Sequence, residues 1–187
     1  MADRPRIYLA GPEVFLPDAL AVGAQKCRLA AEAGLEGVFP LDAALDLSGL
    51  DKRAQARRIS LANEGLIHSC AGLIANITPF RGASMDAGTA FEVGFMRALG
   101  RPVGAYSNCA ASYHARAQSQ RAIGTVGGDC DRPDVAIEDF DLAENLMIEI
   151  SVIESRQEVA LHDAQGDMHD MTAFVRCLAQ MRARLAS

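Results

Sequence analysis

The sequence predicts a single α/β domain in which a doubly wound parallel sheet is flanked by helices. Short apolar runs alternate with longer segments of helical periodicity, and this alternation is typical of parallel sheets with right-handed crossovers. The chain has 187 residues, half of them hydrophobic, which is enough to build one core. No internal repeat divides the chain, so we expect one domain over residues 1–187.

Strands are expected where short β-rich runs end at turn residues. The first run, RIYLA, stops at Gly11 and Pro12, and the run GLIANI has the apolar composition of a central parallel strand. The expected strands cover residues 6–10, 37–40, 72–77 and 102–106.

Helices are expected where hydrophobic residues recur every three or four positions. Gly34 and Gly100 stop two of these segments, and Asp51 can cap another. The expected helices cover residues 18–33, 52–69, 87–99, 143–152 and 168–185. The expected inward stripe of the first is Leu20, Ala24, Cys27 and Ala31, and that of the second is Ala56, Ile59, Ala62 or Asn63, Leu66 and Ile67.

The pattern fails over residues 107–139, which are rich in glycine and predict a long loop. Loops of this length are usually functional or disordered. Its acidic residues Asp129, Asp131 and Asp134 suggest a calcium loop, but no later Glu stands at the offset that such a loop requires. We therefore interpret them as turn residues.

Composition narrows the class of protein. The net charge is −6 and no Lys/Arg run occurs, which argues against a nucleic-acid partner. The apolar runs are shorter than a membrane span, and the first residues lack the apolar core of a signal peptide, so we expect a cytoplasmic protein. The cysteines are odd in number and have no C-x-x-C spacing, which predicts reduced thiols rather than disulfides or a metal site. They are Cys27, Cys70, Cys109, Cys130 and Cys177.

The stretch from 75 to 94 is where we expect the functional site. It has the pattern of a strand end, a glycine-bearing loop and a helix start, which is where open α/β sheets bind ligands. On that helix no Lys or Arg stands three, four or seven positions from Glu92. A helix turned so that Glu92 faces water explains the periodicity equally well. However, Phe91, Val93 and Phe95 indicate a helix buried nearly all round, and an unpaired acid there is a functional-site candidate.

Three further polar residues are ambiguous on pattern alone. Tyr8, near the end of the first strand, fits a core aromatic with a satisfied hydroxyl better than a site residue. Asn63 interrupts the stripe of its helix and can form hydrogen bonds to a base edge if it lies near a cleft. Asp86 can cap the helix that begins at residue 87, bind a ligand, or do both. The loop amides before that helix could also favour an anion such as phosphate.

Four motifs resemble the nucleoside 2-deoxyribosyltransferases, in particular the longer branch found in trypanosomatids and some bacteria. They are YLAGPEVF at 8–15, IANITPFRGASMDAGTAFEVG at 74–94, GRPV at 100–103 and ENLM at 144–147. The resemblance spans roughly residues 6–152, and D-x-G-T-A-F-E-x-G is its specific part. It implies a flavodoxin-like fold and exchange of the nucleobase on a 2′-deoxynucleoside, without a cofactor or metal.

The resemblance also implies roles for individual residues. Glu92 matches the nucleophile, Tyr8 the phenol that orients it, and Asp86 the carboxylate that binds the sugar 5′-hydroxyl. Asn145 matches the residue that a neighbouring subunit lends to that hydroxyl, so the resemblance implies a homo-oligomer. Asn63 falls where some members carry an acid that assists base protonation. We also expect substrate contacts from Gly11, Asn76, Phe80, Gly88 and Met147, whereas Ala44 stands about where other members have a base-contacting Gln.

Two other functions stay open at this point. A related 2′-deoxynucleoside 5′-monophosphate N-glycosidase would hydrolyse its substrate, but such relatives lack the acid six residues before the catalytic Glu, because a carboxylate there repels phosphate. Asp86 therefore favours free nucleosides. The second alternative is a non-catalytic nucleotide-binding module of flavodoxin type, which has no need of an acid in the position of Glu92.

Overall fold

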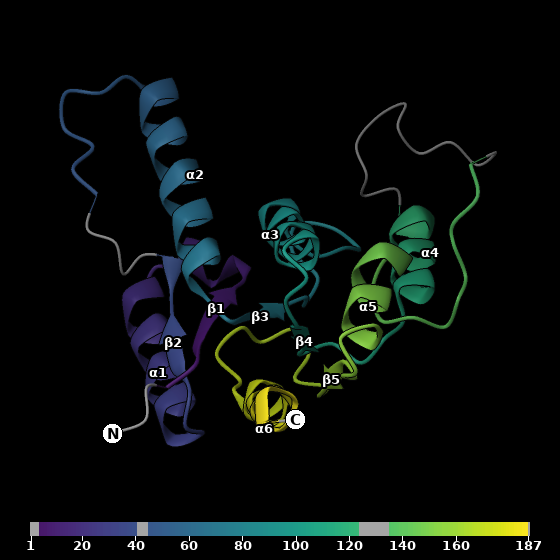
Figure 1. Ribbon diagram of the computed structural model, residues 1–187. Coiled ribbons are helices and arrows are strands. Elements are labelled where there is room, and N and C mark those ends of the chain that lie inside the picture. Colours follow the sequence, from purple (N-terminus) through teal and green to yellow (C-terminus); the bar gives the residue numbers. More distant parts are fainter. Residues whose placement is uncertain (1–3, 41–44, 124–134, 187) are drawn as a thin grey trace.

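The computed structural model describes residues 4–40, 45–123 and 135–186, and within them a five-stranded parallel sheet forms the centre of the molecule (Figure 1). The strand order is β2-β1-β3-β4-β5. This is the flavodoxin-like order of doubly wound sheets, so the predicted fold class is confirmed. The strands are β1 (Arg6–Ala10), β2 (Glu36–Val38), β3 (Gly72–Asn76), β4 (Val103–Ser107) and β5 (Ala160–Leu161).

Helices cover both faces of the sheet. In Figure 1, α2, α3 and α5 lie above the sheet, while α1 and α6 lie below it. A short 3-10 helix, η1 (Pro12–Phe15), follows β1. The α-helices are α1 (Ala19–Glu32), α2 (Lys52–Ser69), α3 (Ala87–Ala98), α4 (Tyr113–Ile123), α5 (Leu146–Ile153) and α6 (Thr172–Ala186).

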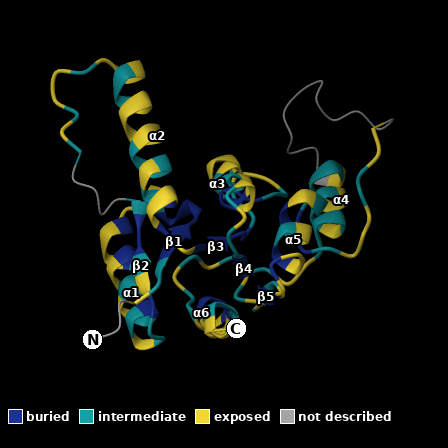
Figure 2. Ribbon diagram, viewed as in Figure 1, coloured by how far each residue is buried: buried dark blue, intermediate teal, exposed yellow. Residues whose placement is uncertain are grey.

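Alternation along the strands divides the interior into two cores, because successive side chains point to opposite faces of a sheet. Tyr8 and Ala10 belong to the core under α2, α3 and α5. Ile7 and Leu9 belong to the core under α1 and α6. Figure 2 shows the strands buried and the outer sides of the helices exposed.

The predicted strands and helices agree with the structure to within a few residues, but three elements have no counterpart among those predicted from the sequence. These are η1, β5 and α4. The expectation of one long loop over residues 107–139 is wrong, because α4 occupies 113–123. Residues 124–134, with the three aspartates interpreted as turn residues, lie outside the described part of the chain, as do Ala44 and Cys130.

The predicted inward face of the first helix is wrong, whereas that of the second is right only near its carboxyl end. In α1 the buried residues include Val22, Lys26 and Ala30, whereas Leu20 is 71% exposed. The first turns of α2 extend beyond the sheet (Figure 2), and there Ala56 and Ile59 are exposed. At the other end of the predicted stripe, Ile67 is buried and Leu66 packs against the core. Packing therefore selects a face of α1 that contains a charged residue, which hydrophobic periodicity could not indicate.

The expectation that α3 is buried nearly all round is also wrong. Its buried residues are Thr89, Val93 and Met96, while Phe91 is 59% exposed. Glu92 is half-buried between these two sides. The helix therefore presents one face to the core and one to solvent, with Glu92 at the boundary.

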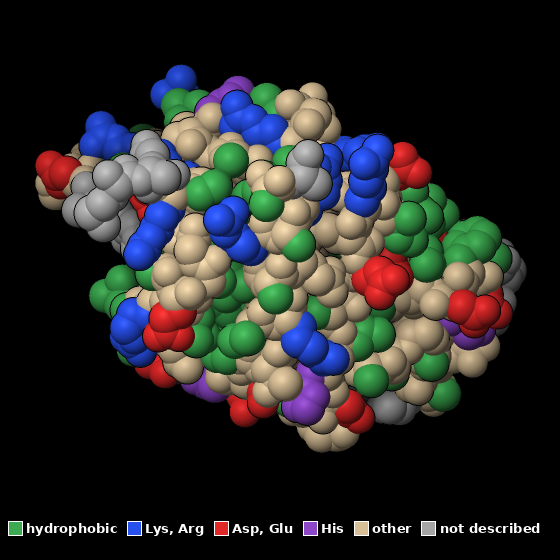
Figure 3. All heavy atoms as spheres, turned by 60° about the horizontal axis from the view of Figure 1, so that its bottom comes forward, with side chains coloured by type: hydrophobic (Ala, Val, Ile, Leu, Met, Phe, Trp, Pro, Cys, Tyr) green, Lys and Arg blue, Asp and Glu red, His purple; other side chains and the backbone are tan. Residues whose placement is uncertain are grey.

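The surface carries no dominant basic region on the face in Figure 3, where Lys and Arg side chains lie singly or in small groups among hydrophobic and acidic ones. Within the described ranges, no helix has the length and apolar character needed to cross a membrane. Among the described cysteines, Cys70, Cys109 and Cys177 carry free thiols, and the Cys27 thiol donates to Gly37 O at 3.4 Å.

A fully buried carboxylate, that of Glu13, joins four elements at the carboxyl ends of the strands. Its Oε1 accepts hydrogen bonds from Lys26 Nζ (2.7 Å), Tyr106 OH (2.7 Å) and Asn76 Nδ2 (3.0 Å). Burial raises the pKa of Glu13, but the charge of Lys26 and the hydrogen bonds from Lys26 and Tyr106 outweigh burial, and the pKa lies below its ordinary value. The ammonium of Lys26 also lies 5.0 Å from the ring centroid of Phe174. One ion pair thus ties η1, α1, β3 and β4 together.

Replacing Lys26 by Met should destabilise the protein by about 3 to 5 kcal/mol, because a buried carboxylate would lose its cation. Unfolding in urea at pH 7 measures the change. Lys52→Met, which changes an exposed residue, is the matched control and should alter the free energy of unfolding by less than about 0.5 kcal/mol. A Lys26→Met protein as stable as the wild type would contradict the assignment of this ion pair.

Candidate active site

A hydrogen bond between residues 84 positions apart joins β1 to α3. The hydroxyl of Tyr8 donates to Glu92 Oε1 at 2.6 Å. Tyr8 reaches α3 because it lies on the face of β1 that α2 and α3 cover. The sequence suggested an unpaired acid, but Glu92 has a partner in the structure. That described partner is a neutral phenol rather than a cation.

The environment of Glu92 keeps its proton affinity high. Burial is the largest cause and raises the pKa of Glu92 to about 7, helped by the charge of Asp86 and opposed by the hydrogen bond from Tyr8. Burial and the neighbouring carboxylate raise the pKa of Tyr8 as well, so its hydroxyl stays protonated and donates. Near neutral pH, Glu92 is thus present in both forms and can act as a weakly solvated nucleophile or a base.

A cavity of about 390 Å³ between α2 and α3 is lined by Glu92 and two other predicted site residues, Asn63 and Gly88. Glu64, which the sequence analysis did not select, brings a second carboxylate into this cavity and accepts a hydrogen bond from Ser60 Oγ at 3.4 Å. No periodic signal marks Glu64, because an acid on a half-exposed helix is ordinary. The remaining lining residues are Ala56, Ile59, Ser60, Ile67 and Phe91.

Asp86 caps α3, as the sequence predicted. Its Oδ2 accepts hydrogen bonds from Thr89 N (2.9 Å) and Thr89 Oγ1 (3.1 Å), while Oδ1 accepts none of the described bonds. A Cβ on Gly88 would lie only 3.0 Å from Oδ2, so glycine leaves room for the cap. Asp86 can therefore cap and still offer one oxygen to a ligand; that second role stays a prediction.

Asn76 and Gly11 serve the Glu13 cluster. Asn76 Oδ1 accepts from Thr78 N (3.0 Å) and Thr78 Oγ1 (2.6 Å), and its Nδ2 donates to Glu13. A Cβ on Gly11 would stand 1.9 Å from Glu13 Oε2, so only glycine fits beside this carboxylate. Both residues shape the carboxyl edge of the sheet, and their expected substrate contacts stay predictions.

Phe80 belongs to an exposed aromatic cluster in the loop after β3. Its ring stacks on Phe15 at 5.5 Å between centroids, and the guanidinium of Arg81 lies 4.6 Å from the Phe80 centroid. Arg81 adopts a left-handed conformation with φ of 56°. Phe80 does not line the Glu92 cavity, so its substrate contact also stays a prediction.

Asn145 and Met147 lie at the start of α5, and neither lines the Glu92 cavity. That cavity is on the α2 side of α3, whereas α5 is on the other side (Figure 1). Asn145 Oδ1 caps α5 by accepting from Met147 N at 3.0 Å, and its Nδ2 donates to Glu138. The Met147 side chain is 71% exposed. Within one chain, these residues do not complete the Glu92 cavity.

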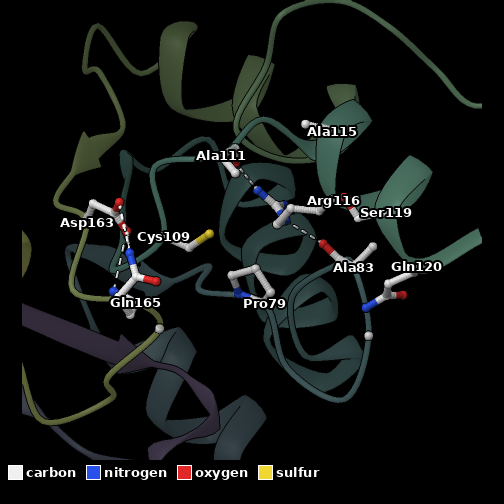
Figure 4. Close-up of a pocket in the computed structure, with 12 residues that line it drawn as sticks. Pro79, Ala83, Cys109, Ala111, Ala115, Arg116, Ser119, Gln120, Asp163 and Gln165 are labelled. Atoms are coloured by element: carbon white, nitrogen blue, oxygen red, sulfur yellow. Dashed lines mark hydrogen bonds between the residues drawn. The ribbon is translucent and has the colours of Figure 1, made fainter. Parts of the chain in front are cut away.

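A second cavity of about 610 Å³ lies at the carboxyl ends of β3, β4 and β5, and none of the predicted site residues lines it (Figure 4). Its walls include Pro79, Cys109, Arg116 and Gln165. In the part of the chain that the structure describes, no group of His, Cys, Asp and Glu could hold a metal. The Glu92 cavity, which combines two carboxylates with a phenol behind one of them, is therefore the candidate active site.

Known proteins resemble this chain in both sequence and fold. A family model described as nucleoside 2-deoxyribosyltransferase matches residues 7–147, a span that contains Tyr8, Asp86, Glu92 and Asn145. An uncharacterised protein of Schizosaccharomyces pombe is 34% identical over 122 residues, which are 63% of this chain and 56% of that protein. The chain thus spans little more than half the length of this curated relative.

Two solved structures are similar in fold. A 2-desoxiribosyltransferase from Leishmania mexicana is 28% identical, with a TM-score of 0.58, and the match covers 77% of this chain and 85% of that one. A conserved protein from Enterococcus faecalis V583 is 20% identical, with a TM-score of 0.56, and the match covers 96% and 99% of the two chains. The second likeness shows the fold alone.

The raised pKa of Glu92 predicts how stability depends on pH. An acid whose pKa rises from 4.5 to about 7 on folding costs no stability below pH 4.5, and costs progressively more as the pH rises to 7. Glu92→Gln should therefore stabilise the protein increasingly across this window, by an amount on the order of 2 kcal/mol above pH 7. Urea unfolding of both proteins between pH 4 and 8 measures the difference. A difference independent of pH would refute the raised pKa.

Proposed function

The chain belongs to the nucleoside 2-deoxyribosyltransferase family, and we propose that it exchanges the nucleobase of 2′-deoxyribonucleosides, a salvage reaction, through a covalent ester on Glu92. The observation that carries the proposal is the Glu92 carboxylate, held by the Tyr8 hydroxyl at the wall of a cavity large enough for a sugar and part of a base. Enzymes with such a nucleophile need no metal or cofactor for this exchange.

The reaction proceeds in two displacements at C1′. In the first, a Glu92 oxygen forms a bond to C1′ while the bond from C1′ to the base nitrogen breaks, and the base leaves with that electron pair and a proton. In the second, a nitrogen of an incoming base attacks C1′ and releases the Glu92 carboxylate, and its proton returns to the group that protonated the first base. Two inversions give net retention, and the negative charge of Glu92 stabilises the oxocarbenium-like transition states.

The leaving base needs a proton, and Glu64 is the residue that we propose to supply it. Glu64 lines the same cavity as Glu92 but belongs to the opposite helix, so a base between α2 and α3 would lie near both acids. The neighbouring Asn63, which also lines the cavity, can donate a hydrogen bond but not a proton. Glu64 therefore suits proton transfer, and Asn63 suits recognition of the base edge.

Asp86 favours a free nucleoside over a nucleotide. Its Oδ1, which takes no part in the described capping bonds, can accept a hydrogen bond from the sugar 5′-hydroxyl. The same charge would repel a 5′-phosphate. The alternative activity, hydrolysis of 2′-deoxynucleoside 5′-monophosphates, is accordingly the second candidate.

The active site is proposed to be completed by a second copy of the chain, which would make the working enzyme a homo-oligomer. Met147, Ile150 and Ile153 are exposed along α5, and such an apolar surface is typical of a protein interface. Asn145 lies at the end of this surface and away from its own Glu92 cavity. An α5 helix from a partner could therefore bring Asn145 to the sugar.

The direct test is incubation with 2′-deoxyinosine and free adenine, followed by chromatography. The wild type should form 2′-deoxyadenosine and hypoxanthine, and Glu92→Ala should lose at least about 10³-fold in rate because no other group can form the ester. Mass spectrometry with a slow fluorinated deoxynucleoside should find the sugar attached to Glu92.

Substrate choice separates the proposal from its rival. Deoxynucleosides should react faster than ribonucleosides, because the 2′-hydroxyl withdraws electrons from the developing cation and crowds the site. Faster turnover of a deoxynucleoside monophosphate to free base and sugar phosphate, little changed in Asp86→Ser, would support the glycosidase instead. Near wild-type exchange by Glu92→Ala would sink the covalent mechanism.

Subunit complementation tests the shared site. Glu92→Ala and Asn145→Ala proteins, each weak or inactive alone, should recover activity when they are unfolded and refolded together, because some mixed assemblies contain a site with both residues intact. Refolding Glu92→Ala with a protein that carries both changes is the matched control and should recover none. If mixed oligomers form without activity, Asn145 does not serve a neighbouring site.

A further inference from the structure

The side chain of Glu144 is a buried carboxylate to which the active-site mechanism assigns no role. Its side chain has no exposed surface. Oε1 accepts from Ser84 Oγ (2.6 Å) and from Asn145 N (3.0 Å), while Oε2 accepts from Met85 N and Arg116 Nη2, both at 3.1 Å. The donors lie in residues 84–85, in α4 and at the start of α5, so Glu144 joins three segments of the chain.

Arg116, which projects from α4, completes this connection. Its Nε donates to Ala83 O at 2.7 Å and its Nη2 donates to Ala143 O at 2.8 Å, in addition to the bond with Glu144. Its Nη1 donates to Ala111 O. Figure 4 shows the guanidinium between Ala83 and Ala111, at the wall of the second cavity. The side chain is only 9% exposed, so the guanidinium is held by the protein rather than by water.

Together the two side chains anchor the segment that leads into α3. Ala83, Ser84 and Met85 form an irregular segment that ends at Asp86, the N-cap of α3. Ala83 O bonds to Arg116, whereas Ser84 Oγ and Met85 N bond to Glu144. An irregular segment without such anchors would have several conformations of similar energy. The bonds therefore determine where Asp86 begins the helix.

The same carboxylate also restrains the start of α5. Oε1 accepts from the backbone N–H of Asn145, the next residue and the cap of α5. Glu144 thus restrains two residues that the proposed mechanism assigns to different active sites. Asp86 serves the site of its own chain, and Asn145 serves the site of a neighbouring chain. A change in the Glu144 side chain would therefore affect both the start of α3 and the start of α5.

We propose that Glu144, supported by Arg116, is a positioning residue that sets the place of Asp86 relative to the substrate sugar and fixes Asn145 at the same time. This inference rests on the proposed function, because it assumes that Asp86 binds the 5′-hydroxyl. Displacing a binding group by about 1 Å can cost about 10²-fold in rate, so the geometry of this anchor matters for turnover.

Glu144→Gln tests the inference, because the amide keeps the shape of the side chain but must turn its NH₂ toward donors. The value of kcat/KM for 2′-deoxyinosine should fall about 10-fold to 100-fold. In an Asp86→Ala background the same change should cost clearly less than in the wild type, because one of the two groups that Glu144 positions is gone and only its effect through Asn145 is left. Glu149→Gln is the matched control. Glu149 also accepts from a backbone N–H in this region, that of Ala143 (2.6 Å), but has no described bond to residues 83–85, and its variant should keep near wild-type kinetics.

Amide hydrogen exchange provides a readout that does not depend on activity. Exchange over residues 82–86 should accelerate in Glu144→Gln and stay unchanged in Glu149→Gln. Should Glu144→Gln fail to fold, Ser84→Ala removes one of the four bonds and should show a smaller loss with the same dependence on Asp86.

The outcomes separate this inference from the proposed function. Equal losses from Glu144→Gln in the wild-type and Asp86→Ala backgrounds, or unchanged exchange at 82–86, would overturn the positioning role. If Asp86→Ala impairs turnover and Glu144→Gln does not, the inference fails while the function stands. If the wild type does not transfer the sugar between nucleobases, the proposed function fails. The amide hydrogen-exchange rates at 82–86 still decide whether Glu144 anchors the segment.

Discussion

The carboxyl edge of the sheet depends on one buried ion pair, that of Glu13 with Lys26. Removing two charges from water is expensive, and here three hydrogen bonds to a single oxygen offset that cost. The geometry leaves no room for any side chain at Gly11, which explains the turn after β1 without reference to a ligand.

Local pattern was enough to predict most strands and helices, and where it failed the cause was tertiary. The face of α1 was predicted wrongly because Lys26 counts as polar in any periodicity, yet the carboxylate of Glu13 draws it inward. The helix α4 was missed because its sequence, YHARAQSQRAI, has no hydrophobic stripe. Its Arg116 bonds to carbonyl groups of other segments, and such contacts leave no trace in a local pattern.

In the candidate site, too, some residues could be identified from local pattern and others only from the fold. Glu92 was identifiable because no cation stands near it on its own helix, and its helix follows a strand and a glycine-bearing loop. Its partner Tyr8 was assigned by family resemblance alone, since its position in a strand suggested only a core aromatic. Glu64 was overlooked, because its significance arises from the packing of α2 against α3. The sequence therefore indicated Glu92, Tyr8 and several residues around them, whereas Glu64 could be found only from the fold.

The burial of Lys26 has a practical consequence for anyone who attaches this protein to a surface or a dye. The chain contains only two lysines, Lys26 and Lys52. The first is fully enclosed and the second is exposed at the start of α2. Amine-reactive reagents should therefore modify the folded chain at Lys52 and at any free amino terminus, giving nearly uniform orientation. Acylation of Lys26 would in turn report the fraction of molecules that have unfolded.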